Sequence, residues 1–296
     1  MVLNFEKKVL KNQELRIKFP DDPKKFMESE IELREAIEEM HVIATVPDLY
    51  PLLIELSTVK TLIALLSHDN TDISIAVVDL IQEMTDIEDV DNSDGVEDFV
   101  DALIDTQILA TLVHNQQRLD ESQKQESDGV HNTLGIIENL AEMRPEICNE
   151  ANPSGLMPWL LKRLRAKMPF DANKLYVSEI LAICVQNNAE NQKTLPSLEG
   201  IDVLLQQLAQ YKRHDPSTSE EQEFMENMFD CLSSCLLLPS NREPFLLGEG
   251  LQLMNLMLRC VSILLASFLN SVDLLEGVFV YFFGGGAMLS CIDCLN

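Results

Sequence analysis

Leu109-Ala110-Thr111-Leu112-Val113 is a short apolar helical stretch, and similar stretches recur along the chain at a nearly constant spacing. From the first residue of one stretch to the first of the next there are 47 residues in three cases and 48 in the fourth. A polar gap and then a longer amphipathic pattern follow these stretches. The other four stretches are Leu62-Ile63-Ala64-Leu65-Leu66, Leu156-Met157-Pro158-Trp159-Leu160-Leu161, Val203-Leu204-Leu205-Gln206-Gln207-Leu208 and Leu251-Gln252-Leu253-Met254.

A repeat of this length with two or three helices per unit predicts an armadillo or HEAT fold. Each repeat can bury its apolar stripe only against its neighbours, so we expect an all-α superhelical solenoid of four to five units. Strand patterns are almost absent before residue 277. The expected organisation is an N-terminal helical capping region at 1–46, repeats at 47–259 and an atypical hydrophobic tail at 260–296. The usual role of such an extended surface is to bind another protein.

Local patterns place several helices. A basic amphipathic stretch covers residues 1–19 and ends at Pro20-Asp21-Asp22-Pro23, because proline interrupts a helix. A second helix is predicted from about Lys24 to Ala44. Asn70 then has the position of an N-cap for a strongly apolar helix over Ile73–Met84.

Three polar segments are predicted to be insertions that follow the short helix of a repeat. Insertions in a solenoid collect on one face, so we expect these segments to be neighbours on the surface. They are an acidic segment between Thr85 and Asp105, Arg118–Asp128 and Lys212–Glu223.

The chain is strongly acidic, with 49 Asp and Glu against 22 Lys and Arg and a formal charge of −27. Such a surface repels phosphate backbones and attracts cations, which favours a basic polypeptide over nucleic acid as a partner. The same charge also keeps an elongated protein soluble without any partner. The seven cysteines lack a disulfide framework and are typical of a reducing compartment. Cys184, Cys231 and Cys235 are predicted to be small core residues.

Five longer runs of sequence carry a family resemblance, and they are Lys11–Asp21, His68–Leu80, Asp128–Leu134, Ala166–Tyr176 and Gly248–Arg259. These runs resemble the β-catenin-like nuclear armadillo proteins. The resemblance implies a nuclear, spliceosome-associated scaffold that has no catalytic activity and no cofactor. It further implies partners that carry basic, nuclear-localisation-type segments, in a complex built round the pre-mRNA-processing ubiquitin ligase and its Myb-like partner.

The chain departs from the family pattern at both ends. Family members begin with a longer region that carries basic import signals, and no such signal precedes Lys11 here. They also continue through further repeats, whereas this chain turns into Cys260-Val261-Ser262-Ile263-Leu264 after Arg259. The expectation is therefore a shortened form whose entry into the nucleus, dimerisation and full partner binding differ from those of the longer proteins.

In armadillo proteins that bind basic peptides, the third helix of each repeat lines the concave groove. We predict that the carboxylates here pair with Lys or Arg in charge-assisted hydrogen bonds, and that an amide binds the backbone of an extended peptide. The alternative is a solvated helix face. One inward position per helix falls at Asp79, Gly135, Glu179 and Asp230, and the position one turn further on falls at Glu83, Asn139, Ile183 and Ser234. The predicted binding residues are Asp79, Glu83, Asn139, Glu179 and Asp230.

Other motifs give little support for metal binding or catalysis. In the acidic segment, an EF-hand register that uses Gly95 puts Val90 where a carboxylate is required, so this segment is predicted to be a mobile insertion. Cys291 and Cys294 form a single pair without a second one, which is a weak metal or redox signal. No nucleophile elbow, phosphate loop or paired-carboxylate motif occurs. We therefore predict a protein that is not an enzyme and holds no metal.

Two alternative functions stay open. One is a self-associating structural module, in which the insertions and the end of the solenoid mediate assembly. The other is peripheral membrane attachment through residues 260–283, which Asp273 and Glu276 disfavour because charges are costly inside a bilayer. The basic run Lys162–Lys167 is interpreted as cations that complement the C-terminal end of a helix dipole.

Overall fold

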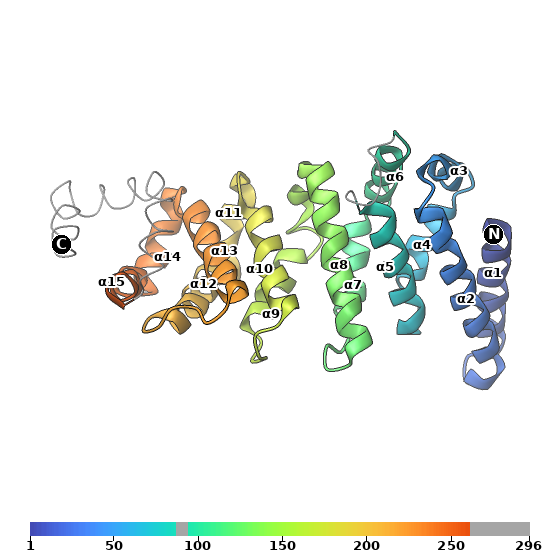
Figure 1. Ribbon diagram of the computed structural model, residues 1–296, viewed down its shortest axis with the longest axis horizontal. Coiled ribbons are helices and arrows are strands. Elements are labelled where there is room, and N and C mark those ends of the chain that lie inside the picture. Colours follow the sequence, from blue (N-terminus) through green and yellow to red (C-terminus); the bar gives the residue numbers. More distant parts are fainter. Residues whose placement is uncertain (87–93, 261–296) are drawn as a thin grey trace. The chain divides into compact units, whose positions relative to one another are not determined.

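The computed structural model describes residues 1–86 and 94–260. All regular elements in these two ranges are helices, which confirms the all-α prediction. The chain forms two compact units, Met1–Leu156 and the part from Met157 onward. Figure 1 shows the order of the helices along the chain.

The first unit begins with a pair of long helices, and two three-helix repeats follow. The long pair is α1 (Val2–Lys18) and α2 (Met27–Ala44), which are joined by the short 3-10 helix η1 (Pro23–Lys25). The repeats consist of η2 (Pro47–Leu49), α3 (Tyr50–Glu55), α4 (Thr58–Leu65) and α5 (Thr71–Thr85), and then α6 (Asp94–Asp105), α7 (Ile108–Gln116) and α8 (Lys124–Met143). The 3-10 helix η3 (Pro145–Glu150) follows as the first element of the third repeat.

The second unit continues the same order of helices. The remaining elements are α9 (Leu156–Arg165), α10 (Ala172–Val185), α11 (Ala189–Thr194), η4 (Leu195–Leu198), α12 (Gly200–Leu208), η5 (Ala209–Tyr211), α13 (Ser219–Leu236), η6 (Pro239–Asn241), α14 (Arg242–Leu247) and α15 (Gly250–Cys260). The five short apolar stretches that recur in the sequence fall in α4, α7, α9, α12 and α15. The armadillo-like repeat predicted from their spacing is therefore confirmed.

A residue with a left-handed backbone stands immediately before the second helix of every repeat. Such a residue turns the chain sharply between two helices without a long loop. In the last two repeats the next residue is glycine, and it is needed there because a Cβ on Gly250 would lie 2.2 Å from Phe245. The left-handed residues are Ser57, Gln107, Gly155, Glu199 and Glu249, with φ between 57° and 84°.

The long third helices form a packed row within each unit. In the first unit, α2 packs against α5 and α5 packs against α8, and Figure 1 shows these three helices side by side. In the second unit, α10 packs against α13 in the same way. Helix α5 is predicted correctly: the side chain of Asn70 accepts a 3.0 Å hydrogen bond from the backbone N–H of Asp72, and Leu80, Ile81 and Met84 are fully buried.

The predicted insertions are only partly correct. Residues 94–105 of the acidic segment form helix α6, because Val96, Phe99, Val100 and Leu103 have i, i+3, i+4, i+7 spacing and are all buried. The residues that decide the calcium alternative, 87–93, lie outside the described residues. The C-terminal part of the segment Arg118–Asp128 forms the first turn of α8, and that of Lys212–Glu223 forms the first turn of α13.

The basic run in α9 makes specific contacts that the dipole interpretation did not include. Arg163 is only 5% exposed, and its Nη2 atom donates to both carboxylate oxygens of Asp171 at 2.9 and 3.0 Å. Arg165 donates to the Glu199 carboxylate at 2.9 Å. These cations therefore join α9 to the elements that follow it.

Several predictions fall on parts of the chain that the structure does not describe. The tail over 261–296, with Cys291 and Cys294 and most of the segment invoked for membrane attachment, lies outside the described residues. Within 1–86 and 94–260, no helix has the length and apolar character needed to cross a bilayer. The boundaries of the three predicted regions stay a prediction.

Candidate protein-binding face

Helix α5 carries the two predicted carboxylates of the first unit, Asp79 and Glu83, one helical turn apart. The buried residues Leu80, Ile81 and Met84 of the same helix point into the core, so the carboxylates lie on the other side. Polar side chains of both neighbouring helices, α2 and α8, contact this stripe of α5.

Asp79 is half-buried and bridges to the next helix. Its Oδ1 atom accepts a 2.9 Å hydrogen bond from Nδ2 of Asn132 on α8. Burial raises the pKa of this carboxyl above its ordinary value, although the Asn132 hydrogen bond and the neighbouring His41 act in the opposite direction. A cation placed beside Asp79 would therefore stabilise a charge that the protein itself only partly compensates.

Glu83 is exposed and bridges to the preceding helix. Its Oε2 atom lies 2.6 Å from Nδ1 of His41 on α2. One and two turns before His41 on α2 are Glu38 and Arg34, which pair with each other at 3.0 Å. The Glu83 side chain is 52% exposed, so a carboxylate oxygen is accessible to a ligand.

Asn139 on α8 is half-buried, and its amide nitrogen makes a hydrogen bond within the protein. Its Nδ2 atom donates to Oγ1 of Thr85 on α5 at 3.3 Å. This contact holds α8 against α5 and fixes the amide in place. The amide oxygen is an acceptor that suits the N–H group of an extended peptide backbone.

These residues define what we call the α2/α5/α8 face: Arg34, Glu38, His41, Asp79, Glu83, Asn132 and Asn139. Its formal charge is −2 with His41 neutral, because Arg34 cancels Glu38 and leaves the two α5 carboxylates. Carboxylates flanked by fixed amides are suited to bind Lys or Arg side chains together with the backbone that carries them.

The other two predicted binding residues belong to the second unit. Glu179 on α10 is half-buried, and Asp230 on the adjacent helix α13 is exposed. The two helices are linked at this level by Asn227, whose Nδ2 atom donates to Oγ of Ser178 at 3.1 Å. Partial burial of its carboxyl group, followed by the charge of Glu226, raises the pKa of Asp230 above its ordinary value.

The sequence reasoning missed Asn132 and His41. Asn132 lies three residues before Gly135, the predicted groove position of its helix, and faces the preceding helix. His41 was missed because α2 belongs to the region expected to act only as a cap. A comparison of i, i+3 and i, i+4 neighbours of each predicted groove position would have found Asn132.

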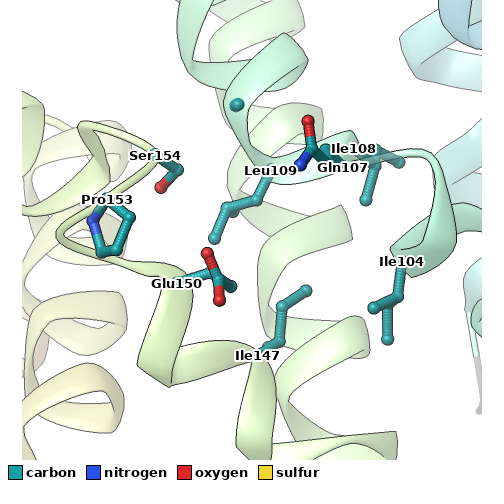
Figure 2. Close-up of a pocket in the computed structure, with 9 residues that line it drawn as sticks. Ile104, Gln107, Ile108, Leu109, Ile147, Glu150, Pro153 and Ser154 are labelled. Carbon is teal, nitrogen blue, oxygen red and sulfur yellow. The ribbon is translucent and has the colours of Figure 1, made fainter.

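A separate cavity lies elsewhere in the first unit, and none of the predicted residues lines it (Figure 2). Its volume is about 370 Å3, and its walls come from the α6–α7 turn and from η3 with the loop that follows. It combines the apolar side chains of Ile108, Leu109 and Ile147 with the polar ones of Gln107 and Glu150. Among the residues that the structure describes, no three His, Cys, Asp or Glu side chains are grouped to hold a metal ion.

Comparison with known sequences identifies related proteins. The profile of a family described as "Catenin-beta-like, Arm-motif containing nuclear" matches residues 1–274. Beta-catenin-like protein 1 of rat and that of human are each 65% identical over 274 residues, which is 92% of this chain and 49% of those proteins. The fission yeast homologue is 38% identical over 255 residues, or 86% of this chain and 45% of that protein. The chain thus spans about half the length of these relatives.

Solved structures support the fold. A designed armadillo repeat protein in complex with the peptide (KR)4 aligns with a TM-score of 0.54 and 15% identity, over 76% of this chain and 85% of that one. A β-catenin structure, from work on its phosphorylation-controlled interaction with cadherin, aligns with a TM-score of 0.53 and 17% identity, over 77% of this chain and 39% of that one. At these identities the likeness concerns the armadillo fold alone.

Proposed function

This chain belongs to the family of catenin-beta-like, Arm-motif containing nuclear proteins, and from that premise we propose that it binds basic segments of nuclear splicing factors. The family uses a scaffold fold and is not known for catalysis, which agrees with the prediction of a non-enzymatic protein. Armadillo repeats are protein-binding modules, as the designed protein with its (KR)4 peptide illustrates. What we propose beyond the family's scaffold role is that the partner segment is basic and that the partner is a nuclear splicing factor.

The observation that carries the proposal is the pair Asp79 and Glu83 on the α2/α5/α8 face. Both carboxylates are held in place by a neighbouring helix, through Asn132 and His41 respectively. A preorganised acceptor loses little side-chain entropy when a cation arrives. Repeating Lys or Arg side chains on an extended peptide would place one cation near each carboxylate.

Neutralising both carboxylates is expected to weaken binding of a fluorescent (KR)4 peptide by about fivefold, since exposed ion pairs contribute roughly 0.2–1 kcal/mol each. The variant is Asp79→Asn with Glu83→Gln, and the measurement is fluorescence anisotropy at low and at moderate salt. Wild-type affinity should fall steeply with salt because the attraction is screened.

Asp98→Asn with Asp105→Asn is the matched control for that experiment. It removes two exposed carboxylates from α6 in the same unit and changes the net charge equally without touching the α2/α5/α8 face. An equal loss of affinity in this control, or binding that does not respond to salt, would show that general charge rather than this face recognises the peptide.

Binding should also weaken as the pH is lowered, and it should do so at a pH above about 3.9, the ordinary pKa of an aspartate. The reason is that burial raises the pKa of Asp79, whereas the Lys and Arg of the peptide keep their charge. Anisotropy titrations between about pH 7.5 and pH 4.5, at constant ionic strength, should show a smaller slope for Asp79→Asn than for the wild type. An identical slope in the two proteins would remove Asp79 from the site.

The raised pKa of Asp79 also predicts how Asp79→Asn affects the stability of the protein. Because the pKa of Asp79 is raised in the folded state, its protonation favours folding, and stability from this group is gained as the pH falls through that pKa. At neutral pH the uncharged amide introduced by Asp79→Asn therefore should not lower the melting temperature. Loss of affinity in Asp79→Asn then reports on the site and not on unfolding.

The nuclear part of the proposal rests on the family to which the chain belongs. A fluorescently tagged copy of this chain should concentrate in the nucleus together with a co-expressed Lys/Arg-rich splicing-factor segment. If the two proteins colocalise equally well when the chain carries Asp79→Asn and Glu83→Gln, capture through this face is wrong.

A further inference from the structure

An apolar cavity of about 450 Å3 opens on the first unit, and no residue of the α2/α5/α8 face lines it. Every residue that lines it is apolar, and they come from the first turn of α1, the C-terminal end of α2 and the η2–α3 segment. Ile43 and Leu53 of the lining are buried, whereas the six large side chains used below are 39–73% exposed: Leu3, Val42, Val46, Leu49, Leu52 and Leu56.

These exposed side chains are not needed for the core of the unit. Helix α3 already buries Tyr50 and Leu53 on its inner side, and the ring centroid of Tyr50 lies 5.1 Å from that of Phe99 on α6. The Tyr50 hydroxyl donates to the carbonyl oxygen of Ala44 at 3.2 Å, which fixes α3 to the end of α2. Leu49, Leu52 and Leu56 therefore form an exposed apolar stripe that adjoins the buried side of this anchored helix.

The spacing of the exposed side chains suits a helical ligand. Leu49, Leu52 and Leu56 follow i, i+3, i+7 spacing, and Val42 and Val46 follow i, i+4 spacing on the adjacent segment. Two such ridges with a cavity between them form the kind of surface into which an amphipathic helix lays its apolar side. Exposed apolar side chains that gather round a cavity, unlike scattered single ones, are typical of an interaction site.

The charges around the cavity are mostly negative. Asp48 and Glu55 lie within one turn of Leu52 and are exposed, and Glu39 is exposed one turn before Val42. Two exposed cationic side chains also lie within a turn of lining residues, namely Lys7 after Leu3 and Lys60 after Leu56. A helix that docks here is therefore favoured when Lys or Arg residues flank its apolar stripe.

We propose that this cavity binds an amphipathic helix of a partner protein, with Leu-like side chains at i, i+3, i+4 and i+7 and with Lys or Arg beside them. The site differs in chemistry from the α2/α5/α8 face, which would take an extended basic peptide through carboxylates. One chain would then hold two kinds of segment, and the two sites can be tested separately.

The test uses a fluorescein-labelled amphipathic peptide of Leu and Lys with Leu at those positions, and a scrambled peptide of the same composition. Wild-type protein should bind the first peptide saturably and the scrambled one at least about tenfold more weakly. Leu52→Asp should weaken binding of the first peptide at least about tenfold, although it adds a negative charge that attracts Lys. The loss would therefore report on apolar contact.

Leu247→Asp is the matched control, because Leu247 is 78% exposed on α14 and lies in the other unit. Val46→Asp serves as a second variant in the lining, and unchanged circular dichroism and (KR)4 binding establish that each variant is folded. The proposal is overturned if Leu52→Asp and Val46→Asp bind the amphipathic peptide as well as the wild type does. It is also overturned if these substitutions abolish a concentration-dependent dimer, or binding to vesicles of phosphatidylcholine and phosphatidylserine, because the occupant would then be a second copy or a lipid surface.

Discussion

Reversing the charge of the α5 stripe is expected to weaken binding of the (KR)4 peptide by about 12-fold, or roughly 1.5 kcal/mol. The variant combines Asp79→Asn with Glu83→Lys. It removes two attractive contacts of roughly 0.2–1 kcal/mol each and adds repulsion of a similar size between the introduced lysine and the peptide. Glu83 is an exposed side chain whose partner is His41, so a lysine at this position leaves the core unchanged.

The reference for this experiment is the double variant Asp79→Asn with Glu83→Gln, for which an about fivefold loss of affinity is expected. Isothermal titration calorimetry at low salt measures both variants with unlabelled peptide. If the lysine variant binds no more weakly than the glutamine variant, then no peptide cation lies near position 83, and the proposed face is wrong.

Removing the Phe224 ring is expected to lower the free energy of unfolding of the second unit by about 4 kcal/mol, the range for large aromatic-to-alanine changes in a core. Phe224 on α13 is 1% exposed and lies where α13 packs against α10. Its ring centroid is 5.6 Å from that of Phe170, in an edge-to-face arrangement, and 5.3 Å from Nζ of Lys174. Phe224→Ala therefore removes packing and also uncovers a buried ammonium group.

Trp159 provides a signal for that measurement, because it is the only tryptophan of the chain and is buried in α9 of the second unit. Urea unfolding followed by its fluorescence should show a large fall in the midpoint for Phe224→Ala. Leu247→Ala changes an exposed side chain of the same unit and should alter stability by less than about 0.5 kcal/mol. A fall below about 1 kcal/mol for Phe224→Ala would mean that the α10–α13 contact is not a close-packed core.

The repeat architecture could be predicted because its second and third helices carry strong local signals. The stretches that begin at Leu62, Leu109 and Leu156 are apolar at helical spacing and recur at a fixed interval, so that one pattern repeated five times outweighs any single ambiguous segment. The N-cap at Asn70 could also be predicted from a local signal, since an Asn residue directly precedes an apolar helix.

The first helices of the repeats could not be predicted with equal ease. Helices α3, α11 and α14 have only six residues each, which is too short for a periodic pattern to stand out. After α3, and after the η4 turn that follows α11, the left-handed residues are Ser57 and Glu199, in place of the glycine that would have signalled a helix end. In α6 the many carboxylates suggested an insertion, although the apolar residues beneath them have helical spacing.

The candidate site was predictable as a set of helix positions but not as a set of contacts. Asp79 and Glu83 lie on one side of α5 because they are four residues apart on a helix, and their role in binding stays a prediction. The packing of neighbouring helices decides which side chains of α2 and α8 contact these two carboxylates. Those side chains are His41 and Asn132, which are 38 and 53 positions away from Asp79 in the sequence. The role of Glu179 and Asp230 in binding stays a prediction.

A structure of this chain with bound (KR)4 peptide tests the central claim most directly. The proposal predicts that the peptide lies extended across α2, α5 and α8, with Lys or Arg nitrogen atoms within about 4 Å of the carboxylates of Asp79 and Glu83. A peptide bound to another surface of the first unit, with the Asp79–Asn132 and Glu83–His41 contacts undisturbed and unoccupied by cations, would contradict it.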